Sequence, residues 1–253
     1  MAYKLMAIDI DGTLLNHKGK ISSANKTAVK KLVDQGTKIV LCTGRPFKEA
    51  IEYAKELGLD KTQEYLIDYG GSMIQDYNGK VIYQQTMRNH DCTEISQFLF
   101  AHKIAFKMID TQGNLYDSDQ EWTERRMLQP DLAVLKFLMT THKHKLIKWS
   151  ELLHTTYDQK FFVVETSPKE VEICPKDTNK GTGLEHLIKY LKLEPKHVVA
   201  IGDMDNDLPM LKLAGLSIAM GNANDNVKEI CDQETSDNDH DGLAHAIEQY
   251  LLK

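Results

Sequence analysis

The feature that most constrains the fold is the alternation of short apolar runs with amphipathic helical stretches at both ends of the 253-residue chain. Strands are predicted over residues 4–10, 37–42, 65–69, 197–201 and 216–220, and helices over residues 23–35, 46–57, 182–191, 208–213 and 243–251. Apolar strands separated by helices are typical of a parallel sheet that is covered on both faces. The sequence therefore predicts an α/β fold with a doubly wound, mostly parallel sheet.

Local signals mark where several of these elements begin and end. Ser22 or Ser23 can cap the first helix, and Gly36 can stop it. Pro46 fits the first turn of the second helix. Asn78-Gly79 predicts a tight hairpin between residues 72–77 and 80–85.

The middle of the chain follows a different pattern. Helical stretches are predicted at about residues 91–102 and 131–139, and alternating strand-like segments at residues 104–109, 160–166 and 170–174. We therefore expect an inserted α+β domain over residues 85–178, and a core formed by residues 1–84 and 179–253.

Composition narrows the classes of partner and compartment. The net charge of −6 argues against bulk binding of nucleic acid, which normally needs a basic face. No apolar run approaches the roughly 20 residues of a membrane span, and acidic residues occupy the place of a signal peptide's apolar stretch. The four cysteines form no CxxC pair and are expected to be free thiols in a cytoplasmic protein; they are Cys42, Cys92, Cys174 and Cys231.

Four polar clusters follow predicted core strands or precede predicted helices, where an open α/β sheet places its ligand crevice. They are Asp9-Ile10-Asp11-Gly12-Thr13, Thr43-Gly44-Arg45-Pro46, Lys180, and Gly202-Asp203-Met204-Asp205-Asn206-Asp207. Residues two apart on a strand point to the same side, so the carboxylates of Asp9 and Asp11 are expected to face one site. A hydroxyl and backbone N–H groups at a helix start suit a phosphate, which favours Thr43 and Gly44 as its ligands.

Together, in this order, the clusters resemble the four motifs of the haloacid dehalogenase-like phosphatases, and the pattern is most similar to the Cof-type hydrolases. The resemblance spans nearly the whole chain, although the insert matches in position more than in sequence. It implies a Rossmann-like core with a larger cap inserted into it. It also implies hydrolysis of a small phosphorylated metabolite, such as a sugar phosphate, with Mg²⁺ as cofactor.

The chemistry assigns a role to each motif residue. Asp9 is expected to attack phosphorus and form an aspartyl-phosphate, while Asp11 acts as general acid and then as general base. That role requires a higher pKa for Asp11 than for Asp9, for which partial burial of Asp11 is expected. The expected metal ligands are Asp9, Asp203 and, from the resemblance, the backbone carbonyl of Asp11.

The remaining motif residues are expected to bind phosphate or to support the metal. Lys180 supplies positive charge to the phosphoryl oxygens, and the N–H groups of Ile10 and Gly44 join Thr43 there. Asn206 is carried over from the resemblance as a phosphate contact or as a residue that orients an aspartate. Asp207 is assigned to the surroundings of the metal rather than to the metal itself.

Several alternatives stay open at this point. A phosphotransferase or phosphomutase would use the same aspartyl-phosphate, and a non-catalytic binding module could keep the fold. Lys176 competes with Lys180 for the place ahead of the helix, and residues 142–145 are interpreted as a solvated stretch that enters a strand. The oligomeric state and the substrate are not fixed by the sequence.

Two departures from the family pattern concern substrate choice. Members usually carry an asparagine before the glycine in the loop after the third strand. This chain has Asp68-Tyr69-Gly70-Gly71 there, with Gly70 in place of the asparagine. The insert is also somewhat shorter than is typical.

Overall fold

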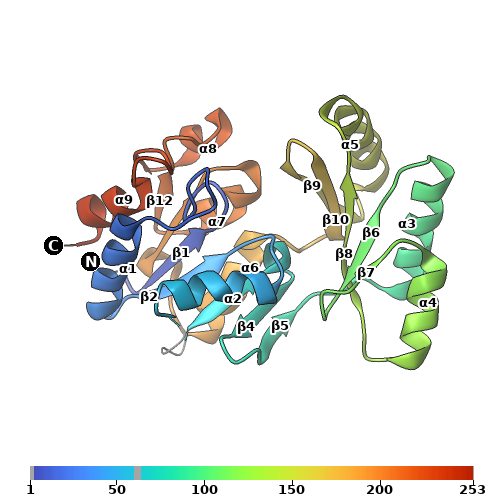
Figure 1. The fold of residues 1–253 in the computed structure, drawn as a ribbon, viewed down its shortest axis with the longest axis horizontal. Coiled ribbons are helices and arrows are strands. Elements are labelled where there is room, and N and C mark those ends of the chain that lie inside the picture. The colour runs from blue at the N-terminus through green and yellow to red at the C-terminus, as the bar shows by residue number, and fades with distance from the viewer. Residues whose placement is uncertain (1–2, 60–63, 253) are drawn as a thin grey trace. The chain divides into compact units, whose positions relative to one another are not determined.

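The computed structural model describes residues 3–59 and 64–252, which form two compact units. The first unit joins the chain up to Gln84 with the chain from Asn179 onward, and the second runs from Gln85 to Thr178 (Figure 1). Each unit has its own cluster of buried apolar side chains, so each is described by itself.

The first unit is built on an eight-stranded sheet with the order β13-β12-β11-β1-β2-β3-β4-β5. Neighbours from β13 through β3 pair in parallel, whereas β3–β4 and β4–β5 are antiparallel. The strands are β1 (Leu5–Asp9), β2 (Lys38–Cys42), β3 (Tyr65–Asp68), β4 (Met73–Asp76), β5 (Val81–Gln84), β11 (Val198–Gly202), β12 (Leu216–Ala219) and β13 (Gln233–Glu234).

The helices of the first unit cover this sheet, and the order of the strands reverses direction at β1. Helix α1 packs against α9, and α6 packs against α7. The helices are α1 (Ser23–Asp34), α2 (Phe47–Glu56), α6 (Lys180–Tyr190), α7 (Leu208–Leu213), α8 (Asp225–Ile230) and α9 (Gly242–Tyr250). The predicted fold class is confirmed, and the reversal at β1 is the place where such sheets bind ligands.

The second unit is a five-stranded antiparallel sheet with the order β7-β6-β8-β10-β9. Its strands are β6 (Lys107–Asp110), β7 (Leu115–Tyr116), β8 (Val134–Thr140), β9 (Phe161–Ser167) and β10 (Glu170–Pro175), and its helices are α3 (Asn89–Ala101), α4 (Asp119–Leu128) and α5 (Lys143–Tyr157). Phe137 and Met139 on β8 pack with buried residues of all three helices, such as Ile95, Trp122 and Leu153. Lys136, which directly precedes Phe137 on the strand, therefore belongs to the opposite face.

Several local predictions are confirmed. Ser22 caps α1, with its side chain accepting a hydrogen bond from the Asn25 N–H, and Asn78-Gly79 links β4 to β5. The four cysteines are free, and all but Cys231 are buried.

Three local predictions are wrong. The expected helix over residues 131–139 is mostly strand β8, because its apolar side chains pack with the period of a strand. Residues 142–145 do not enter a strand but begin α5, with His142 at the N-cap. Lys180 does not precede its helix but is the first residue of α6, since Asn179 forms a capping box with Thr182.

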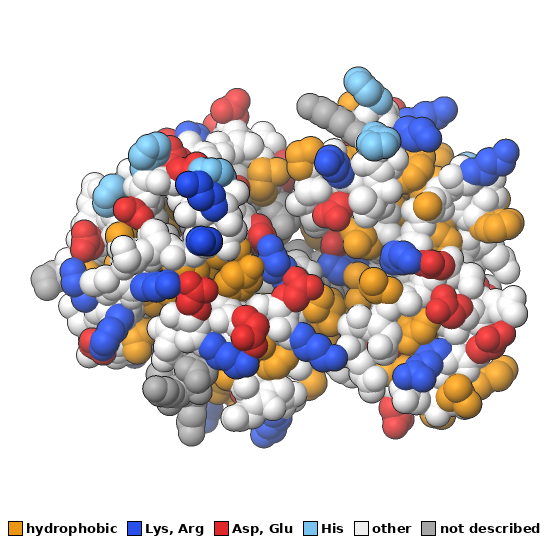
Figure 2. Space-filling view, viewed as in Figure 1, with side chains coloured by type: hydrophobic (Ala, Val, Ile, Leu, Met, Phe, Trp, Pro, Cys, Tyr) orange, Lys and Arg blue, Asp and Glu red, His pale blue; other side chains and the backbone are white. Residues whose placement is uncertain are grey.

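The charge of the surface and the apolarity of the helices concern two expected absences, binding of nucleic acid and insertion into a membrane. On the face shown in Figure 2, basic and acidic side chains are interspersed over both units, as the small net charge leads one to expect. Across residues 3–59 and 64–252, no helix has the length and apolarity needed to cross a membrane.

Candidate active site

The site forms at one edge of the first unit's sheet, where the parallel strands end. Asp9 is the last residue of β1 and pairs in register with Cys42 of β2, so Thr43 follows beside it. On the other side, Ile8 pairs with Ile201, which places Gly202 and Asp203 next to the end of β1. The fold thus brings together two strand ends that are about 190 residues apart along the chain.

Three buried carboxylates gather around one lysine at this edge. The Lys180 Nζ donates hydrogen bonds of 2.6 Å to Asp9 Oδ1 and of 2.6 Å to Asp207 Oδ1. Carboxylate oxygens of Asp9, Asp203 and Asp207 lie within 4.8 Å of one another. Asp207 also accepts hydrogen bonds at Oδ2 from the N–H groups of Asp203 and Met204, at 3.0 and 3.1 Å. One ammonium therefore faces three carboxylates in a buried cluster.

The excess of negative charge appears in the pKa values of the cluster. Burial raises the pKa of Asp9 well above its ordinary value, and the charge of Asp207 adds to this, although Lys180 opposes it. Burial, together with the charge of Asp207, raises the pKa of Asp203 to about 7. Burial disfavours the charged form of Lys180, but Asp207 and Asp9 outweigh it and raise the pKa of that ammonium.

These residues fit a hard divalent cation. Asp9 Oδ2 is buried and accepts no hydrogen bond, an arrangement that costs free energy unless a cation or donor meets that oxygen. A set of carboxylate oxygens is also the donor set that Mg²⁺ prefers. Asp9, Asp203 and Asp207 thus form a cluster that a magnesium ion would neutralise.

Asp203 is held by two neutral donors. Thr13 Oγ1 donates to Asp203 Oδ1 at 3.2 Å, and Asn222 Nδ2 donates to Asp203 Oδ2 at 3.3 Å. Neither Thr13 nor Asn222 received a role from the sequence. The position of Asn222, three residues after β12, follows the same strand-end rule that found the other clusters.

Asp11 lies in a different environment from the one predicted. Its side chain is 55% exposed rather than partly buried. Arg45 donates to both carboxylate oxygens, from Nε to Oδ2 and from Nη2 to Oδ1, each at 2.7 Å. The hydrogen bond to Asp11 raises the pKa of Arg45. The expectation of a partly buried Asp11 is wrong, because Asp11 lies beyond the end of β1 at Asp9, in the loop that leaves the sheet.

The predicted phosphate-binding residues also lie at this edge. Ile10 and Thr43 are buried, directly after β1 and β2. Thr43 Oγ1 accepts a hydrogen bond from the Arg45 N–H at 3.1 Å, and Gly44 lies between them in the loop that leads to α2. Asn206, in the short turn after β11, has a buried side-chain oxygen without a hydrogen-bond partner.

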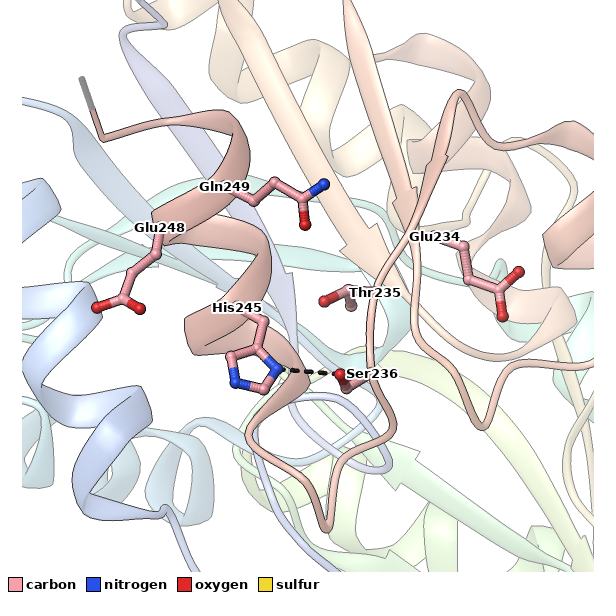
Figure 3. A pocket seen from close by; sticks show the side chains of 6 residues that line it. All are labelled: Glu234, Thr235, Ser236, His245, Glu248 and Gln249. Carbon is pink, nitrogen blue, oxygen red and sulfur yellow. Dashed lines mark hydrogen bonds between the residues drawn. The ribbon is translucent and has the colours of Figure 1, made fainter.

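A separate pocket of the first unit contains none of the predicted residues. It lies between β13 and α9, where Ser236 Oγ and His245 Nδ1 are 3.0 Å apart (Figure 3). The two glutamates that line it pair with lysines, Glu248 with Lys31 and Glu234 with Lys228. Among the described residues, no carboxylate of this pocket is bonded to His245. The histidine therefore lacks the acid that orients it in a catalytic triad.

Comparison with known proteins identifies the family of the chain. Residues 6–247 match the family model of the haloacid dehalogenase-like hydrolases. A relative from Bacillus subtilis, 5-amino-6-(5-phospho-D-ribitylamino)uracil phosphatase YcsE, is 31% identical, with 98% of this chain and 96% of the relative covered. Another from B. subtilis, phosphatase YwpJ, is 27% identical over 98% of this chain and 100% of the relative.

A solved structure shares the whole architecture. The crystal structure of a haloacid dehalogenase-like hydrolase from Bacteroides thetaiotaomicron superposes with a TM-score of 0.81 at 29% identity, covering 98% of this chain and 99% of the other. The expected family and the expected phosphatase enzyme are both confirmed at this level. The chain belongs to the haloacid dehalogenase-like hydrolases.

Proposed function

We propose that this chain hydrolyses a small phosphomonoester through a covalent phosphoryl group on Asp9. The observation that carries the proposal is the asymmetry of the Asp9 carboxylate. Lys180 holds Oδ1, whereas the buried Oδ2 has no hydrogen-bond partner. An oriented carboxylate whose second oxygen has no donor keeps the lone pairs of that oxygen open to a cation and to phosphorus, as a nucleophile at a metal site requires.

The cation in this proposal is Mg²⁺, bound by Asp9, Asp203 and the backbone carbonyl of Asp11. When bound, Mg²⁺ would neutralise the charge that otherwise keeps a phosphate dianion away from these carboxylates. Asp207 supports the site by holding Lys180 and two N–H groups of the loop after β11. Lys180 remains positively charged, because the two carboxylates bonded to it stabilise its charged form.

The proposed reaction has two displacements. In the first, Asp9 attacks phosphorus, the bond from phosphorus to the substrate oxygen breaks, and Asp11 gives its proton to that oxygen. In the second, Asp11 takes a proton from water as the water attacks phosphorus, which releases inorganic phosphate and regenerates Asp9. Thr43, Asn206 and the N–H groups of Ile10 and Gly44 are proposed to hold the phosphoryl oxygens.

The contact between Arg45 and Asp11 adds one requirement. Arg45 donates hydrogen bonds to both oxygens of the Asp11 carboxylate, whereas the first step needs one of these oxygens to face the leaving group of the substrate. Asp11 must therefore leave Arg45 before it can act as the acid. Its exposure leaves the side chain free to turn.

The substrate class is proposed from the relatives. One relative is named for a phosphorylated ribityl compound, and the resemblance of the motifs points to sugar phosphates. We therefore expect turnover of small polyol or sugar phosphates in preference to phosphoproteins or nucleic acids.

The test is a panel of phosphorylated metabolites assayed for inorganic phosphate with Mg²⁺ present, beside the isosteric Asp9→Asn variant. We expect Asp9→Asn to lower kcat by at least about 10³-fold, as losses of nucleophiles do. Borohydride added during turnover should reduce the acyl phosphate, so mass spectrometry should find homoserine at position 9. Retained activity in Asp9→Asn would disprove the assignment, and transfer to hydroxyl acceptors without phosphate release would favour a phosphotransferase.

A further inference from the structure

Asn222 bonds to both segments that carry the proposed cation site. Its Nδ2 donates to the Gly12 carbonyl at 2.9 Å and to Asp203 Oδ2 at 3.3 Å. Gly12 follows Asp11 in the loop after β1, whereas Asp203 follows β11. One amide group therefore links the two strand ends on which the site is built.

The space between those two strand ends is very small. Gly12 has φ +86°, and a Cβ atom at this position would lie 2.3 Å from Asp203 Oδ2. Only a glycine can bring its backbone this close to the carboxylate and adopt that conformation without strain. The Asp203 carboxylate thus lies against the Gly12 backbone, with Thr13 bonded to one oxygen and Asn222 to the other.

A second loop, residues 236–239, makes hydrogen bonds to Asn222 and to the residue before it. The Asn222 Oδ1 accepts a hydrogen bond from the Asn238 N–H at 3.0 Å, and the Gly221 N–H donates to the Ser236 carbonyl at 3.1 Å. The Asn238 side chain continues to the Leu15 carbonyl, at 2.8 Å. The Asn222 amide is therefore fixed at both Nδ2 and Oδ1, although the residue is exposed.

We propose that Asn222 is a positioning residue that holds the Asp203 carboxylate in place for the cation. Asp203 lies beside two other buried carboxylates, and their repulsion favours a rotation of its side chain away from the cluster. Neutral donors oppose that rotation without adding a charge that would compete with the cation. This is how groups around a metal site orient its ligands.

This inference rests on the proposed function, because it concerns the same cation site. The experiment is calorimetric titration of the protein with Mg²⁺ alone, for wild type, Asn222→Ala and Asn222→Leu. The leucine keeps the size of the side chain but removes its hydrogen bonds. We expect the Kd for Mg²⁺ to rise by about 10- to 100-fold in both variants, the range seen when such orienting partners are lost.

Asn226→Ala provides the matched control. Asn226 is also an exposed asparagine whose Nδ2 donates to an aspartate, Asp205, at 3.1 Å, but Asp205 is not part of the buried cluster. We expect its Kd for Mg²⁺ to equal that of wild type. Circular dichroism melts in EDTA would show whether any variant is destabilised without metal.

The outcomes separate this inference from the proposed function. A wild-type Kd in Asn222→Ala and Asn222→Leu, with only a lower Tm in EDTA, would mean a structural role and overturn the inference. So would a wild-type protein that binds no Mg²⁺. Weaker Mg²⁺ binding in both variants, together with a wild type that releases phosphate from no monoester, would support the inference and refute the proposed function.

Discussion

Among the described residues, each unit of this protein buries one lysine against carboxylates, and the two arrangements differ in their balance of charge. In the second unit, Lys136 Nζ donates to Glu172 Oε1 at 2.7 Å, with both side chains buried. In the first unit, Lys180 meets Asp9 and Asp207, and Asp203 lies in the same cluster. Burying a charge that is not neutralised costs free energy, so an excess of buried negative charge indicates a site that binds a cation. A lysine–glutamate pair is already neutral and needs no further ion.

The largest difference between the two lysines should appear on their replacement by methionine. Lys180→Met should lower kcat by about 10²-fold or more, because a preorganised charge at the phosphoryl oxygens is lost. Lys136→Met should lower the free energy of unfolding by about 3–5 kcal/mol, because it leaves a buried carboxylate alone. Phosphate release per folded molecule and urea melts would measure these effects.

The double variants sharpen the same comparison. Lys136→Met with Glu172→Leu should recover most of the lost stability, since an apolar pair of similar volume can replace a buried ion pair. Lys180→Met with Asp207→Leu should recover no activity. Equal behaviour of the two pairs in both assays would contradict the distinction between them.

The unbalanced cluster also predicts how stability depends on pH and on metal. The pKa of Asp203 is raised from 3.8 to about 7, so the folded, metal-free protein keeps a proton that the unfolded chain has lost. The stability from this group is present below about pH 4 and disappears as the pH rises to about 7. Added Mg²⁺ should therefore raise Tm more at about pH 7.5 than at about pH 5, because binding requires the deprotonated carboxylates.

Thermal melts across this pH range, with Mg²⁺ or with EDTA, would measure the dependence. Asp203→Asn is the control, since it should weaken the pH dependence of the metal-free protein between about pH 4 and pH 7 and leave the part that comes from Asp9. A gain in Tm from Mg²⁺ that is the same at both pH values would argue against this cluster as the cation site.

The smallest expected effect concerns the exposed ion pair. Arg45 bonds Asp11 and Glu49 and lies over the Tyr53 ring at 5.5 Å, but its partners are exposed. Arg45→Ala should change the free energy of unfolding by less than about 1 kcal/mol, because exposed pairs are screened by water. Urea melts beside Lys136→Met provide the comparison, and a loss as large as that of the buried pair would contradict it.

The core could be predicted from the sequence because its central strands are buried on both faces. Such strands are continuous apolar runs, so β1, β2 and β11 were located to within about two residues. The rule that ligands bind at the ends of parallel strands then selected Asp9, Thr43 and Asp203. Each of these residues directly follows an apolar run, a pattern that can be seen in a few consecutive residues of the sequence.

The insert was harder to predict because its sheet is packed by helices on one face. Leu132, Leu135 and Met139 match the spacing of a helix, yet residues 134–140 form a strand. Tertiary packing decides that segment. In α5, by contrast, the buried Leu146, Leu153 and Tyr157 recur at the spacing of a helix, so the sequence carries a helical signal there that the interpretation of residues 142–145 as a stretch entering a strand did not use.

The side-chain contacts of Arg45 and Asn222 at the candidate site could not be predicted, because they join residues that are far apart in the sequence. The pairing of Arg45 with Asp11 and the bridge of Asn222 from Gly12 to Asp203 join residues that are from 19 to 210 positions apart. The side-chain conformations that make these bonds depend on the loops around them. Composition and periodicity contain no information about such conformations.

The pairing of β1 with β11 has a consequence for synthesis of the chain on the ribosome. Residues 85–178 emerge as a continuous segment with their own core, so they can fold while the ribosome is still translating the rest. Asp9 is made before the insert, but its neighbours Lys180 and Asp203 leave the ribosome only after it. A nascent chain interrupted anywhere before α6 therefore carries the proposed nucleophile without the lysine that orients it.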